Sequence, residues 1–203
     1  TGDWDTILAI GDSGIVWADS DTRYKWRLND AELPFPQDAA GADAGRWDLN
    51  GDGIHNLADW EDDPRVDPAA GEDESDDELE VSDLIATFSD GVDDDGNGDP
   101  DDICGWDFFD NDNNAFGNLD TSYGRHGQGV AQGAGAEGGD GGQIGTCPSC
   151  SLLPLRVGDT FLVDGERVGR AVVYATDAGA SVMGLAIGAL STGPLVEDAV
   201  SYA

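Results

Sequence analysis

The C-terminal quarter of the chain alternates two kinds of apolar segment, and this alternation limits the folds open to it. SLLPLRV and SVMGLAIGAL are short apolar runs of the kind that form buried strands. Between them, GERVGRAVVYATDAGA carries apolar residues at helical spacing, including Val168 and Val172, and Gly179 stops the pattern. PLVEDAVSYA then opens a second helix with Pro194 at its start. Strands that alternate with helices predict a parallel sheet with crossover helices.

The remaining strands of this predicted sheet come from earlier in the chain. DTILAIGDSG is an apolar run that ends in a tight turn, and ICGWDFFDNDNN contains a short aromatic strand. We expect strands near Ile7–Ile10, Leu152–Val157 and Ser181–Ile187 to lie parallel in one sheet. Helices that begin near His126 and near Glu166 should cover its faces. The aromatic residues of ICGWDFFDNDNN are more typical of a core than of a substrate site.

Acidic residues are concentrated in the middle of the chain. The sequence has 43 acidic and 9 basic residues, for a formal net charge of −34, and the acids crowd between Asp38 and Asp120. Such a charge excludes nucleic acid as a partner, because phosphate binding needs clustered Lys and Arg. Self-repulsion on this scale needs bound cations or high salt. We interpret residues 38–102 as an acidic, loop-rich insertion. A single lysine, Lys25, also fits a salt-adapted surface.

The segment DLNGDGIHNLAD, residues 48–59, has the spacing of a calcium-binding loop. Oxygen donors occupy loop positions one, three, five, nine and twelve, and Gly53 stands at position six, where the loop must turn. This pattern is that of an EF-hand with Asp for Glu at its end, and it resembles the dockerin form. The predicted ligands are Asp48, Asn50, Asp52, the carbonyl of Ile54, Asn56 and Asp59. A solvated acidic turn is the alternative. His55 should point outward and have no function.

The segment DDDGNGDPDD, residues 93–102, predicts a second calcium site. The predicted ligands are Asp93, Asp95, Asn97, the carbonyl of Asp99, and Asp102. The window departs from the EF-hand at its last position, which falls on Cys104. The alternative is again a turn, but one that would pack like charges together without a counterion. We therefore expect Ca²⁺ as the cofactor of this protein.

The cysteines and the chain ends bear on where the protein works. Cys147 and Cys150 form the sequence CPSC, which predicts a local disulfide typical of an extracellular protein. A zinc site is the alternative, and it would have to recruit Cys104 and His55. No apolar run reaches the ~18 residues of a membrane span, so we expect no membrane partner. Thr1 is interpreted as the start of a processed or trimmed product.

Two segments carry candidate catalytic residues. SYGRHGQGVAQGAG sets His126 among glycines, which indicates a close approach of another part of the chain to this backbone. ILAIGDSGI ends a predicted strand at Asp12. An Asp beside a His is the arrangement that orients an imidazole for general-base work. Taken singly, Asp12 is equally well read as a turn cap and His126 as a surface loop residue.

Four segments in order resemble the subtilisin-like serine peptidases. These are ILAIGDSGI, GVDDDGNGDPDDICGWDFFDNDN, GRHGQGVAQG, and the pair CSLLPLRV and AVVYATDAGASVMGLAIG. The resemblance covers most of the chain. It implies an α/β fold of three layers, with a mainly parallel sheet and helices on both faces. It also implies Asp12 and His126 as catalytic residues. Ala186, Ile187 and Gly188 would then form an edge on which an extended substrate pairs as an added strand.

The chain departs from the family pattern at three positions and lacks one motif. Gln128 stands for the usual threonine, Gln132 for a glycine, and Gly11 for a bulky aliphatic residue. The family's oxyanion asparagine and nucleophile serine would lie beyond Ala203. We therefore expect residues 1–203 to be the N-terminal portion of a subtilisin-like peptidase domain, with an incomplete fold. Its C-terminal part would be a partner.

The sequence leaves two functions open. The first is an extracellular, calcium-dependent serine endopeptidase of subtilisin type, acting on proteins or peptides, with its nucleophile on a missing or separate C-terminal part. This chain alone is then expected to be inactive. The second is a non-catalytic, calcium-stabilised structural or assembly protein derived from a subtilase half-domain. The three departures from the family pattern support the second function.

Overall fold

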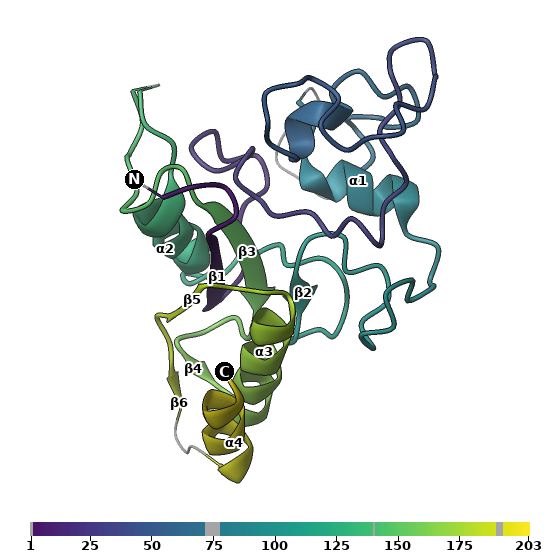
Figure 1. Ribbon diagram of the computed structural model, residues 1–203. Coiled ribbons are helices and arrows are strands. Elements are labelled where there is room, and N and C mark those ends of the chain that lie inside the picture. Colours follow the sequence, from purple (N-terminus) through teal and green to yellow (C-terminus); the bar gives the residue numbers. More distant parts are fainter. Residues whose placement is uncertain (1, 72–77, 140, 190–192) are drawn as a thin grey trace.

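A computed structural model describes residues 2–71, 78–139, 141–189 and 193–203, and its centre is a parallel sheet (Figure 1). The strand order is β2-β3-β1-β5, and every neighbouring pair is parallel. The strands are β1 (Ile7–Asp12), β2 (Trp106–Asp107), β3 (Ser151–Arg156) and β5 (Val182–Leu185). The predicted parallel sheet is confirmed, with β1 lying between β3 and β5.

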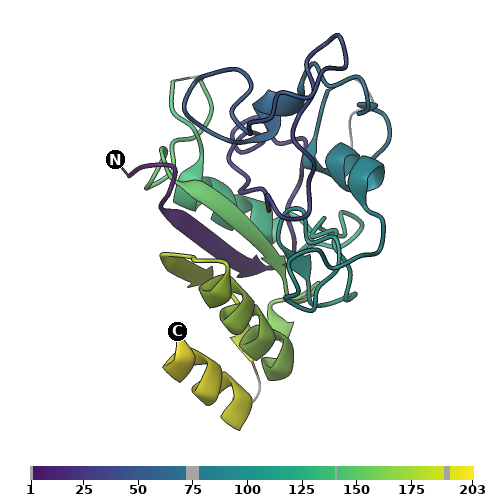
Figure 2. The ribbon, with the colours of Figure 1, turned by 45° about the vertical axis from the view of Figure 1, so that its right-hand side comes forward.

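Helices cover both faces of the sheet, as predicted (Figure 2). Helix α2 (His126–Gly135) packs on one face and α3 (Gly165–Asp177) on the other, and α4 (Pro194–Tyr202) packs against α3. The start of α3 is fixed by Asp164, whose carboxylate accepts from the N–H of Glu166. The fold is therefore the three-layer α/β arrangement that the subtilisin resemblance implied.

Alternation along β1 explains how one strand supports two cores. Ile7 and Ala9 belong to the cluster on the α3 side, which includes Ala171 of that helix. Ile10 belongs to the cluster on the α2 side, with Ala131. Because successive strand residues point to opposite faces, both layers are held by the same six residues.

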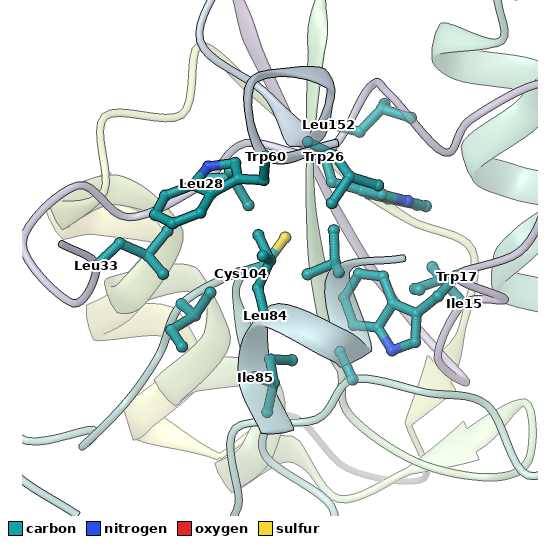
Figure 3. Packing of buried hydrophobic residues seen from close by; sticks show 14 of the residues in the cluster. Ile15, Trp17, Trp26, Leu28, Leu33, Trp60, Leu84, Ile85, Cys104 and Leu152 are labelled. Atoms are coloured by element: carbon teal, nitrogen blue, oxygen red, sulfur yellow. The ribbon is translucent and has the colours of Figure 1, made fainter. Parts of the chain in front are cut away.

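The acidic segment contains regular structure that the sequence analysis did not predict. It forms a 3₁₀ turn, η1 (Leu57–Trp60), and a helix, α1 (Val81–Phe88). Side chains from both elements join the cluster on the α2 side (Figure 3). They are Leu57, Trp60, Val81, Leu84 and Ile85, and they pack with residues such as Trp17, Trp26 and Leu152. The acidic surface is thus anchored by apolar residues shared with the body. Residues 72–77 lie outside the described part.

The last strand of the sheet is shorter than predicted. β5 ends at Leu185, so Ala186 and Ile187 lie outside the strands, and Gly188 begins β6 (Gly188–Ala189). β6 pairs in parallel with β4 (Leu162–Val163), and the N–H of Gly188 donates to the carbonyl of Phe161 at 2.6 Å. The expected strand through Ile187 was wrong, because the chain leaves β1 here and pairs with β4 instead.

The cysteines adopt the simpler of the two predicted states. Cys147 and Cys150 form a disulfide, and Cys104 is a free thiol in the core. Burial raises the pKa of the Cys104 thiol well above its ordinary value, and the carboxylate of Asp102 adds to this effect. The arrangement does not support the zinc alternative. None of the helices formed by the described residues is long and apolar enough to span a membrane.

Candidate active site and acidic loops

Asp12 and His126 meet at one edge of the sheet. Asp12 is the last residue of β1, and His126 is the first residue of α2. The predicted hydrogen bond between them is present: Asp12 Oδ1 lies 2.7 Å from His126 Nδ1. The Asp12 side chain is 2% exposed and that of His126 33% exposed. A buried carboxylate thus orients an imidazole that solvent can reach.

Glycines allow α2 to begin directly against the end of β1. A Cβ atom at Gly127 would lie 2.2 Å from the carbonyl oxygen of Gly14 and 3.0 Å from Cβ of Asp12. Gly14 itself has a φ of +93°, which favours glycine. The close approach indicated by the glycines around His126 is therefore made by the turn that follows Asp12.

Ser13 fixes this turn through three hydrogen bonds. Its N–H donates to Asp12 Oδ1 at 2.7 Å, and its hydroxyl donates to the carbonyl of Tyr123 at 2.7 Å. The same hydroxyl oxygen accepts from the N–H of Gly127 at 3.2 Å. Asp12 Oδ1 therefore has two donors, whereas Asp12 Oδ2 is buried without a partner among the described residues.

The three departures from the subtilisin pattern each have a structural partner. Gln128 is buried, accepts from the N–H of Val16 at 3.0 Å and donates to Thr22 Oγ1 at 2.8 Å. Gln132 donates to Asp19 Oδ2 at 2.8 Å. Both bonds tie α2 to the segment after β1. At Gly11, a Cβ atom would lie 2.5 Å from the Leu185 side chain.

An aromatic residue beside the histidine was missed by the sequence analysis. The ring of Tyr123 stacks on the imidazole of His126, with centroids 4.7 Å apart and planes at 27°. The ring of Phe161 lies 5.8 Å from that of Tyr123. An aromatic residue one helical turn before the histidine was the only available signal, and it does not by itself indicate stacking.

The two acidic loops share one pattern of hydrogen bonds. In the first loop, Asp48 accepts from the N–H groups of Gly51 and Gly53 at 2.6 and 3.1 Å. In the second loop, Asp93 accepts from those of Gly96 and Gly98 at 2.7 and 2.9 Å. These are loop positions four and six in both cases. The segments are therefore folded alike around their first carboxylate.

The loops differ in the carboxylate that closes them. In the first loop Asp59, at position twelve, accepts from the N–H groups of Leu49 and Asn50 at 2.8 and 3.2 Å. In the second loop the equivalent N–H groups, at positions two and three, belong to Asp94 and Asp95. They donate to Glu32 at 2.9 and 3.2 Å. Glu32 thus takes the place of Asp59. Its position in the sequence gave no signal, because it lies 62 residues before Asp94.

Around the second loop, carboxylates converge. Oxygen atoms of Glu32, Asp95 and Asp102 all lie within 4.8 Å of one another. Burial raises the pKa of Asp102 to about 6, although hydrogen bonds from Tyr174, Asn97 and Asn29 oppose the shift. Burial also raises the pKa of Glu32. The charged forms of these groups are therefore costly without a cation.

The structure assigns other partners to some predicted loop residues. The Asn56 amide oxygen accepts from the N–H of Ala58 and caps η1, and its amide nitrogen donates to the carbonyl of Tyr24 at 3.0 Å. The prediction that His55 points outward was wrong: its side chain is only 14% exposed, and Nδ1 lies 2.8 Å from Asp30 Oδ1. The reason is packing, because the imidazole lies 5.0 Å from the ring of Trp47.

Other predicted ligands bond to one another within their loops. Asn50 donates to Asp52 at 3.3 Å, and Asn97 donates to Asp95 at 3.1 Å and to Asp102 at 2.8 Å. Asp52 accepts from the N–H of Ile54 at 2.8 Å, and Asn97 from that of Asp99 at 2.8 Å. The carboxylate of Asp99 lies 3.5 Å from the guanidinium of Arg170. The Ile54 and Asp99 carbonyls were predicted as ligands, and no contact of either tests this.

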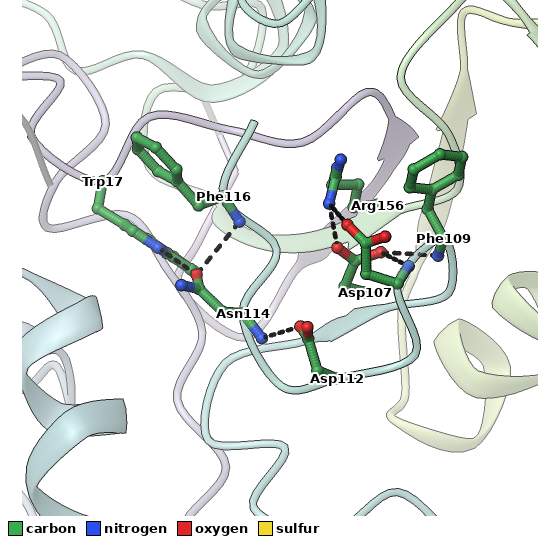
Figure 4. Close-up of polar contacts among 8 residues, drawn as sticks. Trp17, Asp107, Phe109, Asp112, Asn114, Phe116 and Arg156 are labelled. Carbon is green, nitrogen blue, oxygen red and sulfur yellow. Dashed lines mark hydrogen bonds and ion pairs between the residues drawn. The ribbon is translucent and has the colours of Figure 1, made fainter. Parts of the chain in front are cut away.

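A third acidic segment, 107–112, has a cation of its own (Figure 4). The guanidinium of Arg156 pairs with the buried carboxylate of Asp107 and lies 2.6 Å from Asp110. It also stacks on the ring of Phe109, 4.9 Å from its centroid. Although burial acts to lower the pKa of Arg156, the two carboxylates hold it above its ordinary value.

Comparison with known proteins agrees with the geometry of the dyad. The model of the subtilase family, Peptidase_S8, matches residues 4–202. Among curated proteins, none matched the chain significantly. The family match spans both Asp12 and His126 and nearly the whole described fold. The chain therefore belongs to the subtilase family of serine peptidases.

Proposed function

We propose that this chain supplies the aspartate and histidine of a subtilisin-type serine endopeptidase. The observation that carries the proposal is the 2.7 Å bond between the buried Asp12 carboxylate and His126 Nδ1. A carboxylate on Nδ1 holds the imidazole in the tautomer whose other nitrogen can accept a proton. Asp12 is the orienting residue and His126 the general base.

The reaction follows from these roles and from a serine supplied by another part of the domain. The serine oxygen attacks the scissile carbonyl while His126 takes its proton, and an oxyanion donor stabilises the tetrahedral intermediate. His126 then gives the proton to the leaving amine, and water releases the acyl group by the same steps. Asp12 stabilises the imidazolium formed in between. Ser13 does not fit the role of this serine, because its hydroxyl is engaged with Tyr123 and Gly127.

We propose that the partner is the C-terminal part of the same peptidase domain, beyond Ala203, and that the substrate is a protein or peptide. The segment Ala186–Gly188 would bind it by strand addition. Because the N–H of Gly188 donates to Phe161 in this structure, that group becomes available to a substrate only when β6 separates from β4.

We propose calcium as the cofactor of both acidic loops. Carboxylate and amide oxygens are hard donors of the kind calcium prefers, and three carboxylates already converge beside the second loop. Asp48, Asn50, Asp52 and Asp59 would hold one ion. Asp93, Asp95, Asn97, Asp102 and Glu32 would hold the other. The bound ions would neutralise charge and fix the loops.

A location outside the cell fits this proposal. The Cys147–Cys150 disulfide persists in oxidising compartments, and calcium is abundant there. Subtilases are, in addition, typically secreted. We infer that the protein works as a secreted peptidase.

The dyad is tested by reconstitution with a C-terminal part that carries the serine motif. We expect peptidase activity on an unfolded protein and labelling by a fluorophosphonate probe, and neither from this chain alone. His126→Ala should lower kcat/KM by several orders of magnitude, whereas the control His55→Ala should leave it near the starting value. A reconstituted domain that neither cleaves nor reacts would contradict the proposal and favour the non-catalytic, structural alternative.

Calcium is tested on this chain by titration calorimetry and by melting with and without a chelator. We expect two ions to bind, and removal of calcium to loosen residues 47–113 before the sheet melts. At a calcium concentration one hundred times Kd, one site would stabilise the fold by about 2.7 kcal/mol. Equal melting temperatures in calcium and in chelator would refute the proposal.

A further inference from the structure

The proposed role of His126 requires its imidazole to keep one plane as well as one hydrogen bond. The torsion that turns a histidine ring has a broad energy minimum, so its rotamer does not fix the plane. The bond to Asp12 fixes one ring atom and lets the ring tilt about it. One third of the side chain is exposed, so the protein does not enclose it. Something else must hold the plane of the imidazole.

Tyr123 is placed to do this. Its ring stacks on the imidazole with planes at 27°. The ring of Phe161 packs against that of Tyr123, with centroids 5.8 Å apart. Offset stacking of this kind is a favourable geometry for two aromatic rings. The contact therefore opposes any tilt of the imidazole toward Tyr123.

The backbone of Tyr123 is itself held in place. Its carbonyl accepts from the hydroxyl of Ser13 at 2.7 Å and from the N–H of His126 at 2.9 Å. The Ser13 hydroxyl oxygen in turn accepts from the N–H of Gly127 at 3.2 Å. The stacking ring is thus mounted on the same turn that carries Asp12 and the first residues of α2.

We propose that Tyr123 is a positioning residue for His126, holding the plane of the imidazole while Asp12 holds Nδ1. The proposal rests on the proposed function of His126 as general base. It assigns the ring of Tyr123, and not its hydroxyl, to this role. Phe161 supports the ring from a loop that leads into β4, so its contribution is smaller.

The test is NMR of the imidazole signals in histidine-labelled chain. The chain has two histidines, so His55 serves as an internal reference for folding. In the starting protein we expect ring-current shifts on His126 and a slowly exchanging Nδ1–H. Tyr123→Leu should remove the ring-current shift and speed the exchange of Nδ1–H several-fold. Tyr123→Phe should retain both signatures, because the ring remains.

Two further variants keep the test decisive. If Tyr123→Leu disturbs the His55 signals, Phe161→Leu replaces it, because the Phe161 side chain is 51% exposed and its loss should not unfold the chain. We expect it to weaken the same signatures partly. Asp12→Asn should abolish the slow Nδ1–H exchange and keep the ring-current shift. Unchanged His126 signals in Tyr123→Leu, or in Phe161→Leu where it is used, would overturn the proposal. The measurement needs no nucleophile, so an inactive reconstituted domain would count against the proposed function and not against this result.

Discussion

The Arg156 turn, residues 107–112, and the second acidic loop, residues 93–102, meet the same electrostatic problem in different ways. Both bring carboxylates together, and both have a buried one: Asp107 in the turn and Asp102 in the loop. In the turn, a guanidinium from β3 pairs with Asp107 and Asp110. In the loop, the groups that donate to the buried Asp102 among the described residues are all neutral, namely the amides of Asn29 and Asn97 and the hydroxyl of Tyr174.

The difference indicates which part of the acidic surface should change its stability with the calcium concentration. Because the guanidinium belongs to the chain itself, it offsets part of the charge of the turn at any calcium concentration. Neutral donors lower the cost of a buried charge but do not cancel it, as the raised pKa of Asp102 shows. Burial also raises the pKa of Asp107, although Arg156 opposes that shift. The turn should therefore be a permanent part of the fold, and the loop should differ from it chiefly in its response to calcium.

The largest effect is expected from Arg156→Met. Removing one partner of a buried ion pair leaves an uncompensated charge at Asp107 and costs about 3–5 kcal/mol. For a chain of this size the melting temperature should fall by roughly 10 °C. Calorimetry in calcium and in chelator should give the same loss, because Arg156 lies outside both proposed calcium sites.

The matched control is Arg167→Met. Arg167 also stacks on Phe109, 4.6 Å from the ring centroid, and it forms no ion pair with the described residues. Its loss should lower the melting temperature by at most a few degrees. If calcium fully restored the melting temperature of Arg156→Met, the turn would behave as a third cation site. The distinction between the turn and the second loop would then be lost.

An intermediate effect is expected from Glu32→Gln. The amide oxygen can still accept from the backbone of Asp94 and Asp95, whereas the amide nitrogen cannot accept from the N–H of Asp101. The variant therefore loses one charge at the proposed site and one hydrogen bond of the loop. Calcium affinity at the second site should fall by at least tenfold, which is about 1.4 kcal/mol. Titration calorimetry should show the first site unchanged.

Asp59→Asn is the counterpart, and it should weaken the first site and spare the second. If Glu32→Gln left both calcium affinities unchanged, the hydrogen bonds of Glu32 would serve only to shape the loop. The second site would then close on Asp102 alone, as the sequence predicted.

These residues also show how far the sequence could lead. The parallel sheet followed from short apolar runs, because local pattern and burial agree in β1, β3 and β5. Asp12 and His126 could be paired because each ends or begins a regular element within a recognisable motif. In both cases the information lies in a continuous segment of a few residues.

What could not be predicted depends on contacts between distant segments. Glu32 is an ordinary acid among many, and only the fold brings it to the second loop. Helix α1 was hidden because acidic residues surround its eight-residue apolar pattern. The pairing of β4 with β6 ended β5 early, and two-residue strands have no periodicity to detect. Tertiary partners, and not local propensity, decided each of these.

The smallest effect is expected from the titration of Asp102 in calcium-free protein. Its folded pKa of about 6 lies above the ordinary value of 3.8. Between these values the folded state binds a proton that the unfolded state does not. The contribution of this group to stability therefore rises as the pH falls through about 6, and it reverses the usual acid response of a paired carboxylate.

The difference in melting temperature between the starting protein and Asp102→Asn isolates this group from the other acids. In chelator, the starting protein should gain a few degrees relative to Asp102→Asn when the pH is lowered from 7 to 5. This expectation uses a conversion of about 2–4 °C for each kcal/mol. In saturating calcium the dependence should reverse, because protons and calcium compete for the same oxygens. The carboxyl carbon signal of Asp102 gives a direct check by NMR. Titration near 3.8 would mean that Asp102 gains no stability from protonation in the folded state, and the contrast between loop and turn would then rest on calcium alone.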